Sequence, residues 1–336
     1  MKKKLINKND VIFVAGSSGM VGKAICRVFS EAGYEKNGNI LKPIRKDLNL
    51  LDYEKLNYWF SKNKPNIVVM AAAKVGGIKA NSESPVNFLL DNLKIQNNLI
   101  ELSYKHNVRR LLFLGSSCIY PKFSKQPIKE ETLLTGELES TNEWYAVAKI
   151  AGLKLCEAMR IQNNFDAISL MPTNLYGPGD NYSISESHVL PAMIRRFQDA
   201  KDNNEPFVNC WGSGKPLREF MHVDDLAEAI LFVLEQWDPS SENSPKDFRG
   251  NPLPFLNVGT GIDISIKELA ELISKEIGFE GRIQWDLTKP DGTPKKQLDI
   301  NHLKRMGWEP KVSLREGIKS TILDYKKELL KGSLRN

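Results

Sequence analysis

The feature that most constrains this chain is a glycine-rich run near its start. Gly16-Ser17-Ser18-Gly19-Met20-Val21-Gly22 follows the apolar run Val11–Ala15 and opens a helical pattern at about Val21–Ala32. Glycines let a backbone turn tightly and approach a pyrophosphate, while a helix N-terminus offers unpaired N–H groups. The bare pattern also fits an ordinary glycine turn. Its place between a strand and a helix favours a dinucleotide-binding site over that alternative.

The first half of the chain alternates short β-branched runs with longer helical patterns. The expected strands are Val11–Ala15, Ile67–Met70, Leu111–Leu114 and Ala167–Met171. The expected helices are Val21–Ala32, Tyr53–Lys62, Pro85–Lys105 and Trp144–Gln162. This alternation is typical of parallel βαβ units, so the sequence predicts an α/β fold with a Rossmann-like, doubly wound sheet.

The alternation of strand and helix patterns stops after Pro172, where turn-forming residues such as Gly177-Pro178-Gly179 appear. We expect residues 1–176 to form the NADP-binding domain, with 219–262 returning to it. Residues 177–218 and 263–336 would form a smaller substrate-binding lobe. The substrate would then lie in a cleft between them. The polar segment 238–254 reads as a surface loop and carries no functional prediction.

Cations near the expected second strand bear on the choice of cofactor. An NAD site usually carries an acid about twenty residues after the glycines, to hold the ribose hydroxyls. Here Lys42, Arg45 and Lys46 suit a 2′-phosphate instead, although Asp47 keeps NAD open. A solvated basic loop would look the same. The sequence therefore favours NADPH without excluding NADH.

Tyr145 and Lys149 lie four residues apart, so a helix places them on one face. A phenol is a poor acid–base catalyst near pH 7, and we expect the nearby ammonium to lower its pKa. Such pairs are often only structural. Here the pair follows the expected strand Leu111–Leu114, whose carboxyl end would line a ligand crevice. Ser116, in the turn after that strand, would hydrogen-bond a substrate oxygen beside Tyr145.

Two further side chains are candidates for proton transfer. Cys118 follows Ser116 closely, and a thiol there could exchange protons if its pKa were lowered. His188 is one of four histidines and could act as the opposing acid or base. From the residues alone, both also fit purely structural roles.

Composition narrows the remaining classes of function. The formal charge is +6, but the basic residues are interleaved with acids, which argues against a nucleic-acid partner. No apolar run approaches a membrane span, so we expect a cytoplasmic protein without a membrane partner. Cys26, Cys118, Cys156 and Cys210 form no C-x-x-C pair, which argues against a disulfide framework or a metal site.

Taken together, the motifs resemble the extended short-chain dehydrogenase/reductase superfamily and, within it, the GDP-L-fucose synthase family. The resemblance runs from about Val11 to Trp308. It rests on long stretches of the chain: Ala71–Ile78, Leu114–Lys122, Tyr145–Glu157, Met171–Gly177 and Trp211–Leu226.

That family epimerises a GDP-linked 4-keto-6-deoxy-mannose at its third and fifth carbons, then reduces the 4-ketone with NADPH. The resemblance implies a reductive triad of Ser116, Tyr145 and Lys149, with Cys118 and His188 as the epimerisation base and acid. It also implies cofactor contacts from further residues: Leu114, Gly115, Ser116, Ser117, Lys149, Pro172, Thr173, Asn174, Leu175 and His188.

The resemblance further implies that Arg196, Trp211, Arg218 and Asp291 contact the GDP-sugar. Arginines offer forked donors to a diphosphate, and an indole offers a large apolar face. A surface ion pair with Glu219 is the structural alternative for Arg218. One departure is Ser18, where some family members carry an arginine in the glycine loop. Without that arginine, Arg45 would have to supply more of the binding to the cofactor's 2′-phosphate. The preference for NADPH over NADH is therefore less certain.

Three alternatives remain open at this stage. Another nucleotide-sugar epimerase or dehydratase would share the fold, but a dehydratase would carry an Asp-Glu pair where this chain has Cys118-Ile119. A non-catalytic NADP-sensing regulator would typically lack the Tyr145–Lys149 pair. A nucleic-acid-binding protein would show salt-dependent retention on DNA or RNA.

The resemblance also implies a homodimer formed through helices Pro85–Lys105 and Trp144–Gln162.

Overall fold

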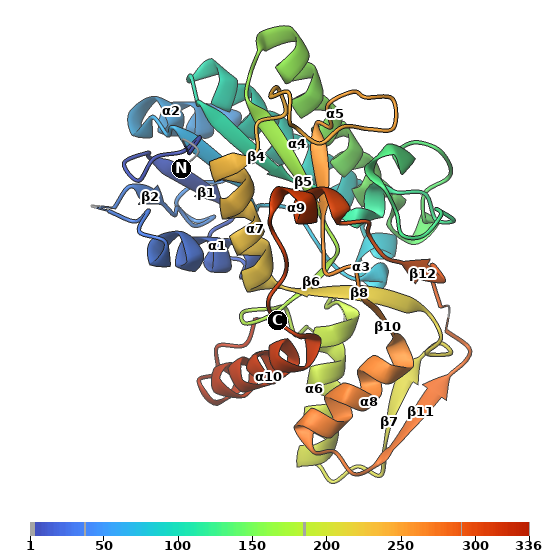
Figure 1. The fold of residues 1–336 in the computed structure, drawn as a ribbon. Coiled ribbons are helices and arrows are strands. Elements are labelled where there is room, and N and C mark those ends of the chain that lie inside the picture. Colours follow the sequence, from blue (N-terminus) through green and yellow to red (C-terminus); the bar gives the residue numbers. More distant parts are fainter. Residues whose placement is uncertain (1–3, 37, 184–185, 290, 336) are drawn as a thin grey trace.

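The structure is a computed structural model that describes residues 4–36, 38–183, 186–289 and 291–335. A parallel sheet of six strands, in the order β2-β1-β3-β4-β5-β9, forms its larger part (Figure 1). Its strands are β1 (Ile12–Ala15), β2 (Ile40–Leu41), β3 (Ile67–Met70), β4 (Arg110–Leu114), β5 (Ala167–Pro172) and β9 (Phe255–Val258). The Rossmann-like α/β fold expected from the sequence is confirmed.

Helices cover both faces of this sheet because its strands are apolar on both sides. Along β1, Phe13 belongs to one buried cluster and Val14 to the other, as strand alternation requires. One face is covered by α1 (Met20–Glu31), α7 (Val223–Gln236) and α9 (Asn301–Met306). The other is covered by α2 (Tyr53–Asn63), α4 (Pro85–Lys105) and α5 (Glu143–Asn163).

Short elements connect the larger ones near the carboxyl ends of the strands. They are α3 (Ile78–Glu83) and the 3₁₀ turns η1 (Ser117–Ile119), η2 (Glu130–Thr132) and η3 (Ser140–Asn142). The turn η1 directly follows the loop after β4, so the residues around Ser116 stand at the carboxyl edge of the sheet.

A smaller part of the molecule lies beneath the large sheet in Figure 1. Its strands are β6 (Asn174–Tyr176), β7 (Phe207–Trp211), β8 (Leu217–His222), β10 (Asp263–Ser265), β11 (Arg282–Asp286) and β12 (Lys295–Lys296). Its helices are α6 (Val189–Asp202), α8 (Ile266–Ile277) and α10 (Leu314–Leu330), which share a third apolar cluster. The strand β8 pairs with β6, β10 and β12 and therefore holds this part together.

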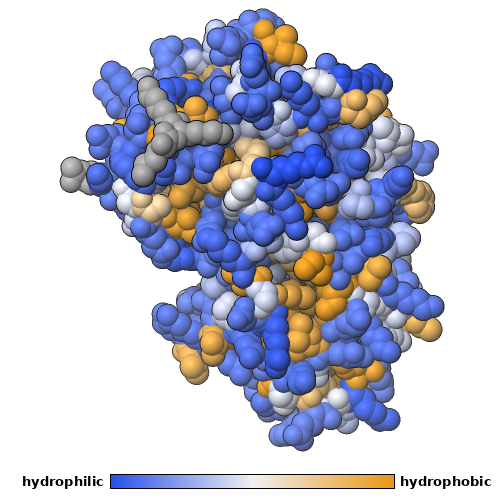
Figure 2. All heavy atoms as spheres, in the orientation of Figure 1, coloured by the Kyte–Doolittle hydropathy of each residue, from blue (hydrophilic) through white to orange (hydrophobic). Residues whose placement is uncertain are grey.

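Some residues of the 263–336 segment pack against the large sheet. Leu303 of α9 and Trp308 belong to the apolar cluster of α1 and α7, and α9 lies against β9. We therefore propose a revised two-part division, in which residues 298–308 join the nucleotide-binding part and β6 and residues 219–222 of β8 join the smaller part. Among the described residues, no helix is both long enough and apolar enough to cross a membrane. The face in Figure 2 is mostly hydrophilic, with apolar side chains gathered near the junction of the two parts.

Candidate active site

The glycine loop joins β1 to α1 with almost no room for side chains. Gly16 has a φ of +87°, and a Cβ there would lie 2.7 Å from the amide nitrogen of Ala72. A Cβ on Gly22 would lie 2.1 Å from the carbonyl oxygen of Gly16. Gly19 is the N-cap of α1 and no side chain caps that helix start. The loop therefore presents backbone and a helix N-terminus, which suits a phosphate ligand.

A cavity of about 530 Å³ opens above this loop. It brings together most of the cofactor contacts expected from the sequence and three of the expected catalytic residues, Ser116, Tyr145 and His188. Those lining it are Gly16, Ser18, Gly19, Met20, Val21, Gly22, Arg45, Gly115, Ser116, Tyr145, Pro172, Thr173, Asn174, Leu175 and His188. Its size and its glycine cradle fit a dinucleotide.

Four of the expected cofactor residues do not line this cavity. The Ser17 hydroxyl donates to the carbonyl oxygen of Pro43 at 3.3 Å, so it fixes the loop instead. Leu114, Ser117 and Lys149 are buried behind the cavity wall. Of the cations expected at the 2′-phosphate, Arg45 lines the cavity, whereas Lys42 pairs with Glu35.

Lys149 lies beneath Tyr145 on α5, as the four-residue spacing predicted. Its ammonium is buried and donates to the carbonyl oxygen of Leu114 at 2.8 Å. It lies 5.7 Å from the centre of the Tyr145 ring and 4.9 Å from that of Phe113. Burial lowers the pKa of Lys149 to about 8, and the nearby thiol of Cys118 opposes that shift.

The pKa of Tyr145 moves in the direction opposite to our expectation. Burial, followed by the neighbouring Cys118, raises the pKa of this phenol well above its ordinary value. The desolvation of the charged form therefore outweighs any help from Lys149. Tyr145 is held protonated, which suits a group that donates a proton.

Cys118 is buried beside Ser116, whose hydroxyl oxygen accepts from the Cys118 amide at 3.3 Å. Burial raises the pKa of the Cys118 thiol, while the ammonium groups of Lys296 and Lys149 act to lower it. His188 is the N-cap of α6, and desolvation by the surrounding protein lowers the pKa of its imidazole. Both groups are thus favoured in their neutral forms near pH 7.

The loop after β3 fixes the position of the His188 segment. The amide of Gly77 donates to the carbonyl oxygen of Glu186 at 2.9 Å. A Cβ on Gly77 would lie 2.7 Å from the carbonyl oxygen of Ser187, so this approach requires glycine. The Ala71–Ile78 stretch therefore positions a residue that lies far along the chain.

The four expected substrate residues lie outside the cofactor cavity, on the smaller part. The guanidinium of Arg196 stacks over Trp211, 5.2 Å from the ring centre. Asp291 accepts from the amide and the hydroxyl of Ser213, at 2.6 and 2.7 Å. Burial lowers the pKa of the half-buried Arg218, and the nearby carboxylates of Glu139 and Asp291 oppose that shift.

The surface ion pair between Arg218 and Glu219 does not form. Glu219 is fully buried, and its carboxylate accepts from the backbone amides of Thr260, Gly261 and Leu298 at 2.5, 2.7 and 2.8 Å. Neighbouring side chains on a strand point to opposite faces, so Arg218 is directed away from this site. Glu219 ties β8 to the segments before β10 and α9.

Lys296 is a candidate that the sequence reasoning missed. It lies on β12 in register with Arg218, and its charge acts on the Cys118 thiol. Burial lowers the pKa of Lys296, and Cys118 opposes that shift. No local pattern around Lys295-Lys296 signals this, because the partners come from β8 and η1.

Comparison with known proteins gives a consistent picture. The family described as "NAD dependent epimerase/dehydratase family" matches residues 12–247. GDP-L-fucose synthase 1 of Arabidopsis thaliana is 51% identical over 96% of this chain and 95% of its own. GDP-L-fucose synthase of Escherichia coli K12 is 48% identical over 92% of this chain and 94% of its own. The crystal structure of a Naegleria fowleri GDP-L-fucose synthetase bound to NADP, 25% identical, superposes with a TM-score of 0.85 over 99% of both chains.

Proposed function

The chain belongs to the NAD dependent epimerase/dehydratase family, and on that premise we propose that it converts GDP-4-keto-6-deoxy-mannose to GDP-L-fucose with NADPH. One observation carries the proposal. A single cavity holds the glycine loop, Ser116, Tyr145 and His188, so cofactor and carbonyl chemistry meet in one place. Cys118-Ile119 stands where a dehydratase would carry its acid pair, which disfavours dehydration.

The cofactor, when bound, supplies a hydride to the 4-ketone. Tyr145 donates a proton to the resulting oxygen, because its raised pKa keeps the phenol protonated. Ser116 lines the same cavity and donates a hydrogen bond to that oxygen. Lys149 holds its place through the carbonyl of Leu114 and supplies positive charge beneath the ring when the phenol loses its proton.

Cys118 and His188 carry out the epimerisation in this proposal. The ketone acidifies the neighbouring C–H bonds, so each inversion needs one group to remove a proton and another to return it. Cys118 acts as the base, and the charges of Lys296 and Lys149 favour its thiolate against the cost of burial. His188 faces the cavity from the start of α6, and its protonated form, the imidazolium, acts as the acid.

The substrate's nucleotide extends from the cavity onto the smaller part. Arg218 and Arg196 offer charge and forked donors to the diphosphate, and Trp211 offers an exposed aromatic face. The hydrogen bonds of Asp291 to Ser213 fix the loop beside Arg218.

The direct test is to incubate the purified protein with GDP-4-keto-6-deoxy-mannose and NADPH. We expect loss of nicotinamide absorbance and a product identified by NMR as GDP-L-fucose. Oxidation of NADPH with an unepimerised product would contradict the roles of Cys118 and His188. No oxidation at all would contradict the proposed substrate.

Solvent exchange separates the two half-reactions. In D₂O, Cys118→Ser and His188→Asn are expected to lower deuterium incorporation into the sugar by at least tenfold, because each removes a proton-transfer group. Cys156→Ser is the matched control, since that buried thiol on α5 lies beside Ser169 of β5, whereas Cys118 bonds to Ser116, which lines the cavity. Undiminished exchange in both test variants would remove these residues from the mechanism.

We also propose that two copies associate through α4 and α5. These helices pack against each other and leave large apolar side chains exposed: Val86, Leu90, Trp144 and Val147. Light scattering is expected to give twice the chain mass, and Leu90→Glu to give the single-chain mass. Leu330→Glu, an exposed change on α10, is the control. A monomeric wild type would contradict this assembly.

We further propose that the protein works in the cytoplasm. All four cysteines are free thiols, as is usual for a reducing compartment. Fractionation of the source cells with an antibody to this chain tests the proposal, and recovery outside the cytoplasmic fraction would contradict it.

A further inference from the structure

The segment that follows α10 returns to the nucleotide cavity. After α10 ends, Gly332 turns the backbone with a φ of +63°, and the amide of Ser333 donates to the carbonyl oxygen of Glu328 at 3.0 Å. Arg335 then lines the same cavity as the glycine loop. Figure 1 places the C-terminus between α7 and α10, where the two parts of the molecule meet.

This tail is attached along its length. The carbonyl oxygen of Arg335 accepts from the amide of Tyr182 at 2.9 Å, and Leu334 packs against the apolar cluster of the smaller part. The segment before Tyr182 is also attached to α10, since the amide of Gly179 donates to the Asp324 carboxylate at 2.8 Å. The Arg335 side chain therefore extends from an anchored backbone toward the cavity.

Its guanidinium stands over the start of α1. One terminal nitrogen of Arg335 lies 4.0 Å from the position that a Cβ on Gly19 would occupy. Gly19 is the N-cap of α1, and neither a side-chain cap nor an acid in the first turn offsets the positive end of that helix. Two sources of positive potential thus face the same space.

Asp180 lies close enough to Arg335 for their charges to interact, but it does not neutralise the guanidinium fully. Asp180 lines the cavity and is only 4% exposed. One of its oxygens accepts from the amide of Asn181 at 2.7 Å, and the other has no hydrogen-bond partner among the described residues. Burial raises the pKa of Asp180 to about 7, and Arg335 only partly opposes that shift. The guanidinium therefore keeps donors for an anion that enters the cavity.

We propose that Arg335 is a cofactor-binding residue that donates to the diphosphate of the dinucleotide, opposite the glycine loop. This inference rests on the proposed use of NADPH. The tail then acts as a clamp from the smaller part of the molecule on a ligand held by the larger part. Arginine suits the task because its planar fork pairs with two phosphate oxygens at once.

The test measures binding of NADPH and NADH by quenching of tryptophan fluorescence, without sugar substrate. A purification tag belongs at the N-terminus, so that the tail keeps its own neighbours. Arg335→Ala is expected to raise the Kd for both dinucleotides about tenfold, the scale of one partly exposed charge-assisted hydrogen bond. Arg335→Lys should recover part of the loss, since it keeps the charge but not the fork.

Arg249→Ala is the matched control, because it removes one exposed arginine from the distant 238–254 loop. It is expected to leave both dissociation constants within about twofold of the wild type. A loss confined to NADPH would overturn the assignment to the diphosphate, since only NADPH carries the 2′-phosphate. Unchanged binding in Arg335→Ala would overturn the inference entirely. Failure of the wild type to bind either dinucleotide would instead overturn the proposed function.

Discussion

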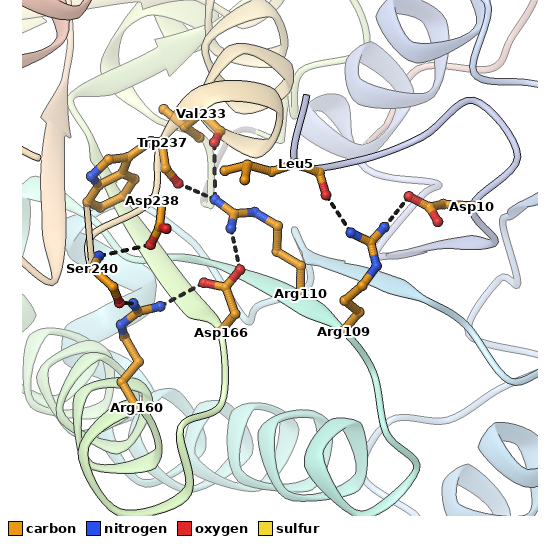
Figure 3. Close-up of polar contacts among 10 residues, drawn as sticks. All are labelled: Leu5, Asp10, Arg109, Arg110, Arg160, Asp166, Val233, Trp237, Asp238 and Ser240. Carbon is orange, nitrogen blue, oxygen red and sulfur yellow. Dashed lines mark hydrogen bonds and ion pairs between the residues drawn. The ribbon is translucent and has the colours of Figure 1, made fainter. Parts of the chain in front are cut away.

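The two ends of the large sheet differ in whether their buried ionisable groups have partners of opposite charge. At the amino end, Arg110 begins β4 with its guanidinium buried and donates to Asp166 and to the carbonyl oxygens of Trp237 and Val233 (Figure 3). Arg160 of α5 donates to the same Asp166 at 2.7 Å. Opposite charges therefore meet, and the last turn of α7 is tied to β4 and β5.

At the carboxyl end, Tyr145, Cys118 and Lys149 lie beside a cavity, and no carboxylate among the described residues pairs with them. Tyr145 and Cys118 are held neutral by burial, and the buried ammonium of Lys149 donates to the carbonyl oxygen of Leu114. Burial of ionisable groups therefore does not by itself identify a functional site. Buried groups with charge partners maintain the architecture, whereas groups with shifted pKa values at a cavity are available for chemistry.

The sharpest test of this contrast is Tyr145→Phe. We expect the rate of ketone reduction to fall by about 1000-fold, because only the proton donor is lost. NADPH binding and the melting temperature should stay near wild-type values. Tyr104→Phe, on the exposed side of α4, is the control. Unchanged turnover would mean that Tyr145 is not the donor.

The complementary change at the amino end is Asp166→Ala. It leaves the buried Arg110 without its carboxylate, so we expect a loss of about 3 kcal/mol in the free energy of unfolding. Urea denaturation measures this loss, and kcat at 25 °C should be unchanged for the folded fraction. A variant that loses turnover while keeping its stability would reverse the assignment of the two ends.

A smaller effect is expected from pH, through the charge of Lys149 at the carboxyl end of the sheet. Lys149 has a folded pKa of about 8 against an ordinary value of 10.5, so burial of its charged form destabilises the fold below pH 8. That cost is relieved as the pH rises from about 8 to 10.5, where the unfolded chain still holds the proton.

Activity should follow the opposite trend, because the reduction uses the charged ammonium. We expect the rate constant for ketone reduction at pH 9 to be about one tenth of its value below pH 7. A flat rate profile up to pH 9.5 would contradict the role given to Lys149.

The smallest effect is expected for Arg160→Ala. Asp166 keeps Arg110 as a partner, while Arg160 gives up its bonds to Asp166 and Ser240. We expect a loss of about 1 kcal/mol in the free energy of unfolding, measured by urea denaturation. A loss equal to that of Asp166→Ala would mean that Arg160, rather than Arg110, carries the stabilisation.

Much of the nucleotide-binding half could be predicted from local patterns. The strand β3 and the helix α4 have the expected bounds, and β1, β4, β5, α1, α2 and α5 differ by about a residue at their ends. Periods of two and 3.6 residues are set by the backbone itself, so they are readable without knowledge of the fold. The glycine run was equally readable, because its dihedral angles and close approaches restrict the residue type.

The electrostatic environment of the site could not be predicted in this way. The spacing of Tyr145 and Lys149 was correct, but the direction of the Tyr145 pKa was wrong, because burial depends on what other segments cover the pair. Glu219 follows Arg218 directly, yet its carboxylate is bound by residues from two later segments.

The sequence by itself determined the parallel sheet, the glycine loop and the set of chemically capable side chains. The tertiary structure alone decided which of these share a cavity, which are desolvated, and that Arg335 returns to the loop at Gly19. The reason is physical. Secondary structure follows from neighbours a few residues apart, whereas desolvation and charge depend on contacts between segments that are distant along the chain.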